Sequence, residues 1–254
     1  MTALLAVDRL SKRFGGVQAV AELSFDVAER EILGIIGPNG AGKTTAINLV
    51  SGVTRPSGGT VRLSGKDVTG LAPHVLVESG LVRTFQATTV YAARTVRENL
   101  LRGAYRQIYA GLLPALLGTP AARAARARAD RHVEDIMGWL DLGRVADRTA
   151  MSLPYGFQKV LGMAIGLAAS PRLILLDEPA AGLSAQDTVR LVRSRGIAVV
   201  VIDHNMRFIS DLCDRVLVMA QGRELARGLP HEVLRNEAVI EAYLGRHYAK
   251  QARH

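Results

Sequence analysis

Cysteine, aromatic side chains and long uncharged runs are all scarce in this chain of 254 residues. The single cysteine, Cys213, can form neither an internal disulfide nor a cysteine-based zinc site, which favours a reducing, intracellular compartment. The longest apolar stretches, 110–122 and 160–170, are broken or ended by prolines and fall short of the roughly 20 residues that a membrane-spanning helix needs. Asp8 and Arg9 come too early for the core of a signal peptide. We therefore expect a soluble, cytosolic protein.

Basic side chains outnumber acidic ones, 32 against 23, which gives a net charge of +9. This balance suits nucleic acid, an anionic membrane surface or phosphate ligands, and equally an ordinary solvated surface. Part of the excess lies in an alanine-rich run with helical spacing, at Arg123, Arg126, Arg128 and Arg131. No aromatic side chains interleave with these arginines, which argues against a surface that stacks single-stranded bases. The run can attract anionic lipid headgroups or contact only water.

Apolar residues make up 48% of the chain, enough for a substantial core, and their pattern changes twice. The first and last thirds carry short, continuous apolar runs typical of buried strands, whereas the middle is helical in pattern. We therefore expect an α/β fold, with a parallel sheet covered on both faces and an inserted helical block. Strands are predicted at 17–27, 31–36, 60–63, 173–176, 197–202 and 215–219, and helices at 44–51, 121–129 and 185–195.

A glycine-rich loop lies between a predicted strand and a predicted helix. Its sequence fits the pattern G-x-x-x-x-G-K-[ST], in which backbone N–H groups and a helix N-terminus surround the phosphates of a nucleotide. Lys43 would supply a positive charge to the β- and γ-phosphates, and the Thr44 hydroxyl would ligate Mg²⁺. The loop consists of Gly37, Pro38, Asn39, Gly40, Ala41, Gly42, Lys43, Thr44 and Thr45.

Ionisable side chains end two of the predicted strands in the last third. One strand runs into Asp177 and Glu178, and another into Asp203 and His204. Asp177 can hold the Mg²⁺ shell, while Glu178 can polarise the water that attacks the γ-phosphate. His204 can reach the γ-phosphate and keep substrate, water and Glu178 in register. Acidic residues are common in loops after strands, so these residues would be weak evidence by themselves. They are informative because they occur together with the phosphate loop.

Together these motifs resemble the ATP-binding subunits of ABC transporters, over nearly the whole chain. The resemblance implies a P-loop NTPase (RecA-like) core with a parallel sheet, an N-terminal antiparallel β subdomain and an inserted helical subdomain. The expected organisation is a single ATPase domain at 1–248, with a core at 1–93 and 171–248 and a helical subdomain at 94–170, and then a loose tail at 249–254.

Individual residues take roles from the same resemblance. Gln86 looks like the glutamine that senses Mg²⁺ and the γ-phosphate and couples to the membrane subunits, and Phe14 like the aromatic residue that stacks on adenine. Tyr155 and Gly156, in the signature stretch 153–158, would face ATP bound to the opposing subunit of a head-to-tail dimer. The implied catalytic residues are Lys43, Gln86, Glu178 and His204, and the implied Mg²⁺ ligands are Thr44, Gln86 and Asp177.

A narrower resemblance is to the ATP-binding proteins of bacterial branched-chain (hydrophobic) amino acid uptake transporters. It rests on the helical insert 99–142, the signature Tyr-Gly, the run 177–183 and the run 237–245. It implies a cytoplasmic protein on the inner face of the plasma membrane, with ATP and Mg²⁺ and no nucleic acid. Its partners would be permease subunits, a second ATP-binding subunit, identical or not, and indirectly a solute-binding protein. Amides, urea and aromatic acids are alternative solutes.

Several departures from the family pattern leave the strength of hydrolysis open. Pro154 replaces the usual signature serine, and Phe157 the usual glutamine. The segment between the loop 180–184 and His204 is about six residues short, roughly one and a half helical turns. The chain could therefore bind nucleotide with little hydrolysis and pair with a more active sister subunit.

A nucleic-acid-linked ATPase of the same superfamily is a further alternative, supported only by the net charge. The surface expected to meet a membrane subunit includes Tyr91, Thr95 and Asn99.

Overall fold

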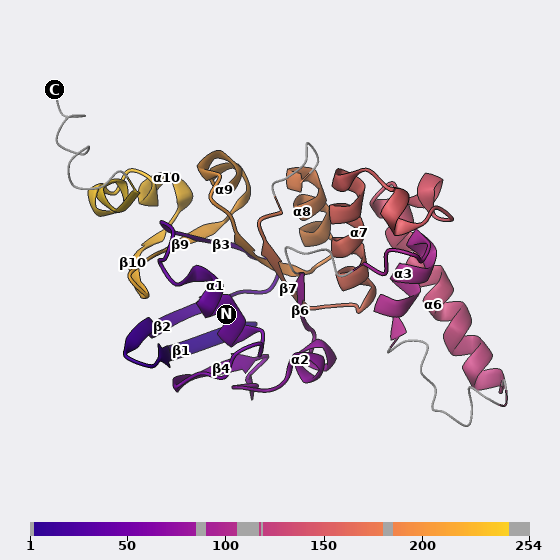
Figure 1. Ribbon diagram of the computed structural model, residues 1–254, viewed down its shortest axis with the longest axis horizontal. Helices are drawn as coiled ribbons and strands as arrows, with labels where there is room; N and C mark the ends of the chain where they lie inside the picture. The colour runs from indigo at the N-terminus through magenta and orange to yellow at the C-terminus, as the bar shows by residue number, and fades with distance from the viewer. Residues whose placement is uncertain (1–2, 85–89, 106–116, 118, 180–184, 244–254) are drawn as a thin grey trace. The chain divides into compact units, whose positions relative to one another are not determined.

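The computed structural model describes residues 3–84, 90–105, 117, 119–179 and 185–243 (Figure 1). The chain divides into two compact units. The first joins Met1–Leu81 to Leu175–His254, and the second is Val82–Ile174. Because the second unit is inserted into the first, the first unit is built from both ends of the sequence.

The larger sheet consists of β3 (Ile32–Ile36), β6 (Leu81–Thr84), β7 (Leu173–Asp177), β8 (Ala198–Ile202), β9 (Arg215–Ala220) and β10 (Arg223–Gly228). Its strand order is β10-β9-β3-β8-β7-β6. β3 pairs in parallel with β8 and β9, while β9 and β10 form an antiparallel pair. Every residue of β3 and β8 is buried, as continuous apolar runs require. The parallel sheet predicted from these runs is confirmed.

The helices of the first unit include α1 (Lys43–Val50), α2 (Pro73–Ser79), α8 (Ala185–Ser194), α9 (Met206–Leu212) and α10 (Pro230–Val233). Figure 1 shows α1 on one side of the larger sheet and α8 and α9 on the other. Both faces of the central strands are therefore covered, as the sequence predicts. The bounds of α1 and α8 agree with the predicted helices to within one residue.

A second, antiparallel sheet is formed by β1 (Leu5–Phe14), β2 (Val17–Val27), β4 (Gly58–Leu63) and β5 (Lys66–Asp67), in the order β2-β1-β4-β5. The sequence analysis did not identify β1. The register of β1 against β2 shifts three times between Val7 and Arg13, and Arg9 has φ 45°. These bulges break the alternation of apolar and polar residues by which an antiparallel strand is recognised.

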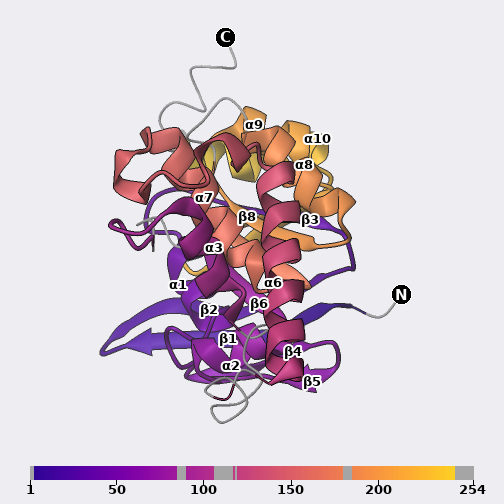
Figure 2. The ribbon, with the colours of Figure 1, turned by 90° about the vertical axis from the view of Figure 1, so that its right-hand side faces the viewer.

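The second unit is mainly helical. It contains α3 (Val96–Gly103), α6 (Pro120–Trp139), α7 (Tyr155–Ala168) and the short 3₁₀ helices η1 (Gly143–Val145) and η2 (Ala150–Ser152). Figure 2 shows α3, α6 and α7 packed side by side. A Cβ atom at Gly103 would lie 2.3 Å from the Ile165 carbonyl oxygen, so glycine lets α3 approach α7 closely. The expected helical block is confirmed.

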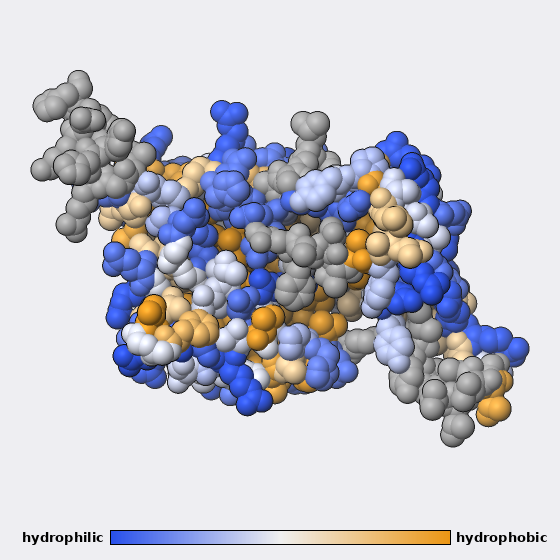
Figure 3. Space-filling view, in the orientation of Figure 1, coloured by the Kyte–Doolittle hydropathy of each residue, from blue (hydrophilic) through white to orange (hydrophobic). Residues whose placement is uncertain are grey.

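The arginine-rich run lies on α6. Arg123, Arg126, Arg128 and Arg131 are all exposed, and Arg126 pairs with Asp130 one turn along. Hydrophilic side chains cover much of this helix (Figure 3). Neither α6 nor any other helix of the described ranges is long and apolar enough to cross a membrane.

Candidate functional site

The phosphate loop joins the end of β3 to the start of α1. Gly42 precedes α1 with φ 95°, a left-handed conformation that glycine adopts without steric cost. Gly37 follows β3 and packs against β9, where a Cβ atom would lie 2.1 Å from the Met219 carbonyl oxygen. The other residues differ in exposure: Ala41 is buried, Pro38, Lys43 and Thr45 are half-buried, and Asn39, Gly40 and Thr44 are exposed.

Lys43 begins α1 and turns its ammonium group back toward the loop. Its Nζ donates hydrogen bonds to the carbonyl oxygens of Gly37, at 2.6 Å, and Pro38, at 3.0 Å. Burial lowers the pKa of this ammonium group, while the charges of Glu178 and Asp177 oppose that shift. Both carboxylates therefore lie close enough to act on this cation, which the motif predicts to bind the phosphates.

Asp177 and Glu178 come at the carboxyl end of β7. Asp177 is half-buried as the last residue of the strand, and Glu178 is exposed. Glu178 has φ 50°, which is uncommon outside glycine, and its backbone N–H donates to the Ile202 carbonyl oxygen at 2.8 Å. This bond ties Glu178 to the end of β8, the strand that leads to His204.

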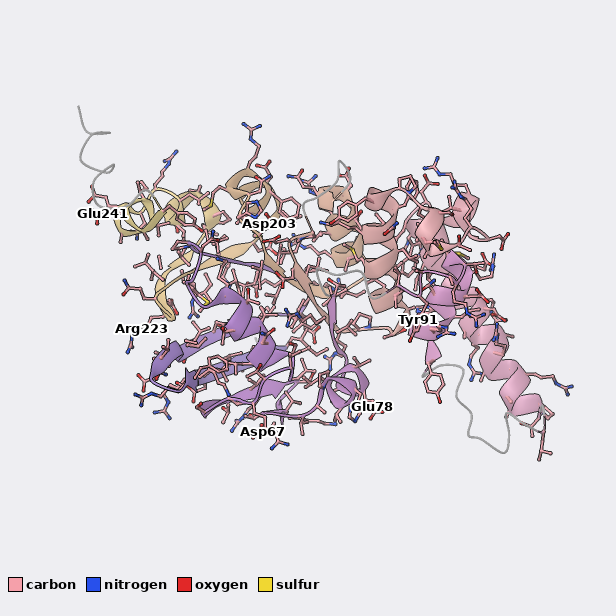
Figure 4. The ribbon with its side chains drawn as sticks, in the orientation of Figure 1. Asp67, Glu78, Tyr91, Asp203, Arg223 and Glu241 are labelled. Carbon is pink, nitrogen blue, oxygen red and sulfur yellow. The ribbon has the colours of Figure 1, made fainter. Side chains whose placement is uncertain are left out.

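His204 follows β8 and is brought next to Glu178. Its Nδ1 lies 3.7 Å from Glu178 Oε1 and 3.9 Å from Asp203 Oδ1. Asp203 is buried, with 1% of its surface exposed, and accepts the backbone N–H of Asn205 at 2.8 Å (Figure 4). Asn205 in turn caps α9 by accepting the N–H of Phe208. The sequence analysis missed that Asp203 and Asn205 fix this turn, although an Asn at a helix start is a signal for capping.

The short segment before His204 keeps its packing. α8 is ten residues long, and its Thr188, Val189 and Val192 are buried. The helix packs on β8 and α9, and Arg190 donates a hydrogen bond to the Asp211 carbonyl oxygen at 3.3 Å. The shortening therefore does not separate His204 from Glu178. The loop 180–184 and Gln86, which the sequence also assigned to the site, lie outside the described residues.

Phe14 ends β1, and 52% of its surface is exposed. The Lys12 ammonium group lies 5.0 Å from the centre of its ring. Lys12 is held by a hydrogen bond to the Arg55 carbonyl oxygen at 2.7 Å. Phe14 is thus no core residue, and it offers a flat apolar surface of the kind that stacks a base.

The signature residues lie at the start of α7, in the second unit. Tyr155 is 64% exposed, and nothing lies within 4 Å of the position that a Cβ atom would take at Gly156. Pro154 immediately precedes the helix and supplies neither a hydroxyl nor an N–H group. The Gln158 side-chain amide donates a hydrogen bond to the Leu153 carbonyl oxygen at 2.9 Å. The open approach to Gly156 allows close contact with a phosphate.

The turn before α3 corrects one expectation. Tyr91 is 53% exposed, projects from this turn (Figure 4) and is covered on one face by the Arg102 guanidinium, 4.1 Å from the ring centre. Asn99 is fully buried, so the prediction that it belongs to a docking surface is wrong. Its side chain hydrogen-bonds to the backbone of Tyr91, Arg94 and Thr95 instead. Thr95 forms a capping box with Glu98 and begins α3.

The donor set at the loop suits Mg²⁺. Within the described ranges, no group of three or more His, Cys, Asp or Glu side chains could hold a metal ion. Mg²⁺ needs no such cluster, because it is usually held by one or two protein oxygens together with phosphates and water. Thr44, exposed in the first turn of α1, and Asp177, at the tip of β7, provide oxygen ligands of this kind.

The comparisons with known proteins agree with this geometry. A family model described as ABC transporter matches residues 20–181. The ATP-binding protein LivG of Salmonella typhimurium, named for high-affinity branched-chain amino acid transport, is 40% identical over 95% of this chain and 98% of its own length. The chain belongs to the ABC transporter family. A second model, branched-chain amino acid ATP-binding cassette transporter, matches residues 223–249. The similarly named BraF of Pseudomonas aeruginosa is 37% identical over 95% of this chain and 98% of its own.

Solved structures give the same result for the ABC transporter fold. A nucleotide-free ATP-binding cassette has a TM-score of 0.82 at 30% identity, covering 96% of this chain and all of that one. An ATP-binding cassette in its ADP conformation has a TM-score of 0.83 at 29% identity, covering 97% of this chain and all of that one. The expected family, its branched-chain amino acid subgroup and the fold class are confirmed. The chain is an ATP-binding subunit, an ATPase coupled to transport.

Proposed function

We propose that this chain hydrolyses ATP to power the uptake of branched-chain or other hydrophobic amino acids through a membrane transporter. The names of the LivG and BraF relatives support this class of solute, as does the match at residues 223–249. A lipopolysaccharide export protein, LptB of Haemophilus influenzae, is also 32% identical over 97% of this chain and 99% of its own. The direction of transport and the solute therefore need a direct test, and amides, urea and aromatic acids are the alternative solutes.

One observation carries the proposal for hydrolysis. Lys43, Glu178 and His204 meet at the carboxyl ends of neighbouring strands, with His204 Nδ1 3.7 Å from Glu178 Oε1 and Lys43 under the influence of the Glu178 charge. In a parallel sheet this edge is where ligands bind. The arrangement combines a phosphate-binding cation, a carboxylate for the attacking water and a polar group for the γ-phosphate.

Each residue then has a defined task. Lys43 and the loop N–H groups bind the β- and γ-phosphates, and Phe14 stacks on adenine. Glu178 orients the attacking water, while His204 holds the γ-phosphate and the water in register. Gln86 senses the γ-phosphate and Mg²⁺. Catalysis thus comes mainly from positioning and charge neutralisation rather than from a covalent intermediate.

Mg²⁺ is part of this proposal. Thr44 would ligate the ion directly, Asp177 would hold it through water, and Gln86 would be a further ligand. When bound, the ion neutralises developing charge on the β- and γ-phosphates. The chain's own contribution is to place oxygen ligands near Lys43, on whose ammonium group the charge of Asp177 acts.

We propose that two ATP-binding subunits close head to tail over two ATP molecules. Tyr155 and Gly156 of one subunit would then face the ATP of the other, at the N-terminus of α7. We assign residues 94–170 to the helical subdomain, 1–93 and 171–248 to the core, and 249–254 to a tail. Permease subunits would contact the exposed turn at Tyr91, on the inner face of the plasma membrane, and a solute-binding protein would act through them. No nucleic acid takes part.

An alternative is a subunit that binds ATP but hydrolyses it slowly beside a more active sister. The observation that favours it is Pro154, which removes the signature hydroxyl at the start of α7. The two versions differ in one respect. A Glu178→Gln change abolishes turnover only if this chain's own site is active.

Uptake of radiolabelled leucine tests the transport assignment. In cells that lack this chain, we expect the wild type, but not Glu178→Gln, to restore uptake. Excess valine or isoleucine should compete with the label, whereas urea, acetamide and benzoate should not. Restoration of urea, amide or benzoate uptake without leucine uptake would overturn the assignment and select one of the alternative solutes.

A further inference from the structure

Asp203 is a buried acid at the end of an apolar strand. Every residue of β8 is apolar and buried, and Asp203, which follows it, is buried as deeply, with 1% of its surface exposed. Burying a carboxylate costs free energy unless the group accepts hydrogen bonds. An apolar residue would continue the strand without this cost, so the carboxylate is expected to contribute something other than packing.

The carboxylate of Asp203 closes the turn that carries His204. Its Oδ1 accepts the backbone N–H of Asn205 at 2.8 Å, so one hydrogen bond spans the residue between them (Figure 4). In such a turn the aspartate side chain takes the place of a backbone carbonyl group. The same Oδ1 lies 3.9 Å from His204 Nδ1. The histidine is therefore held at the tip of a turn that Asp203 keeps closed.

Both ends of this turn are fixed to the first unit. Before it, the Ile202 carbonyl oxygen accepts the Glu178 N–H at 2.8 Å. After it, the Asn205 side chain accepts the N–H of Phe208 at 3.1 Å, and Phe208 is buried in α9. Because the two ends are anchored, the hydrogen bond from Asn205 to Asp203 sets the path of the backbone between them.

The placement of the His204 ring depends on this path. The side chain is 78% exposed, so packing does little to fix it. Its Nδ1 faces two carboxylates, with Glu178 Oε1 at 3.7 Å and Asp203 Oδ1 at 3.9 Å. Nε2, the other ring nitrogen, is then the one left to contact a γ-phosphate.

We propose that Asp203 is a positioning residue for hydrolysis: through its hydrogen bond to the Asn205 backbone it keeps His204 in register with Glu178. This inference rests on the proposed role of His204 and adds a residue to that site. Asp203 is buried and itself touches neither the nucleotide nor the attacking water.

Two substitutions separate positioning from a role in the fold alone. Asp203→Val removes the acceptor but continues the apolar strand, so relief from burying a carboxylate offsets the lost hydrogen bond and the unfolding midpoint should not fall. Asp203→Asn removes the charge but keeps an oxygen that can accept the same N–H. If Asp203 only supported the fold, kcat would follow stability in both variants.

The test measures both variants and the wild type as full chains at the same protein concentration. Phosphate release gives kcat and KM, calorimetry gives the Kd for ATP, and thermal melting gives the unfolding midpoint. Asp203→Val is expected to lower kcat by about 10- to 100-fold, the effect of misplacing a catalytic group. Its Kd for ATP should stay near that of the wild type, because the phosphate loop is intact. Asp203→Asn should retain most of the wild-type kcat.

The control is Val61→Ala in the antiparallel sheet. Val61 is 1% exposed on β4, so its truncation should lower the unfolding midpoint and leave kcat near that of the wild type.

Two results would overturn the inference: a kcat in Asp203→Val no lower than in Val61→Ala, or an Asp203→Asn variant as slow as Asp203→Val. Wild-type turnover in His204→Ala would instead overturn the proposed role of His204, and the inference with it.

Discussion

Two glycines shape the phosphate loop, and each lies where a side chain would meet backbone. Gly42 has a left-handed backbone, φ 95°, at the start of α1, and a Cβ atom there would lie 2.5 Å from the Ala19 carbonyl oxygen. At Gly37 the Met219 carbonyl oxygen occupies the place of a side chain, 2.1 Å from the Cβ position. The pattern G-x-x-x-x-G-K-[ST] predicts both positions, but only the structure shows which backbone atoms exclude a side chain.

A Gly37→Ala change should therefore damage the site through its packing. The new methyl group meets backbone rather than a flexible side chain, so we expect a loss of about 1–3 kcal/mol in the free energy of unfolding. ATP binding should weaken at least tenfold, because the Gly37 carbonyl oxygen that accepts a hydrogen bond from Lys43 moves with the loop. Denaturant unfolding and ATP calorimetry measure the two effects.

The matched control is Gly138→Ala in α6, where nothing lies within 4 Å of the new methyl group. It should be neutral or stabilising by up to about 1 kcal/mol, because alanine favours a helix over glycine. Normal stability and normal ATP binding in Gly37→Ala would contradict the close approach to Met219.

At the scale of elements, one buried side chain organises the turn before α3. Asn99 accepts the Tyr91 backbone N–H at 2.8 Å and donates to the Tyr91 and Thr95 carbonyl oxygens at 3.1 and 2.9 Å. It thereby fixes the segment that presents Tyr91, covered by Arg102, to solvent. The shape of this exposed turn therefore depends on Asn99, which is buried and cannot contact a partner itself.

An Asn99→Ala change tests this dependence. It leaves backbone groups inside the unit without their partner, and we expect a loss of about 1–3 kcal/mol in the free energy of unfolding. Leucine uptake should fall further than the ATP hydrolysis of the isolated chain, because the proposed permease contact loses its shape. Asn236→Ala, which removes an exposed asparagine that accepts the Ala238 N–H at the start of a helical stretch, is the control and should lower stability by about 1 kcal/mol without lowering uptake relative to hydrolysis. Equal effects of the two changes would contradict the account.

The sequence predicts the elements where burial decides them. β3, β8 and β9 are recognisable because strands covered on both faces are continuously apolar. β1 was not recognised because its bulges break the alternation, so the position of Phe14 at the end of a strand was not predicted. The motif residues were found from their spacing, whereas the role of Asn99 depends on hydrogen bonds to the backbone of Tyr91 and Thr95, in a turn that matches no recognised sequence pattern.

For the whole molecule, the relation on which our proposal depends is between the phosphate loop of one subunit and the signature helix of another. The chain places Lys43, Glu178 and His204 in the first unit and Gly156 in the second. A complete site in our proposal needs contributions from two subunits. Hydrolysis by one chain alone should therefore depend on encounters between copies.

Steady-state ATP hydrolysis measured against protein concentration, with Glu178→Gln in parallel, tests this central claim most directly. We predict that turnover by the wild type rises faster than linearly with protein, because two subunits form each site, and that Glu178→Gln is inactive although it binds ATP. A wild type that binds ATP without turnover, or a Glu178→Gln variant as active as the wild type, would contradict the account.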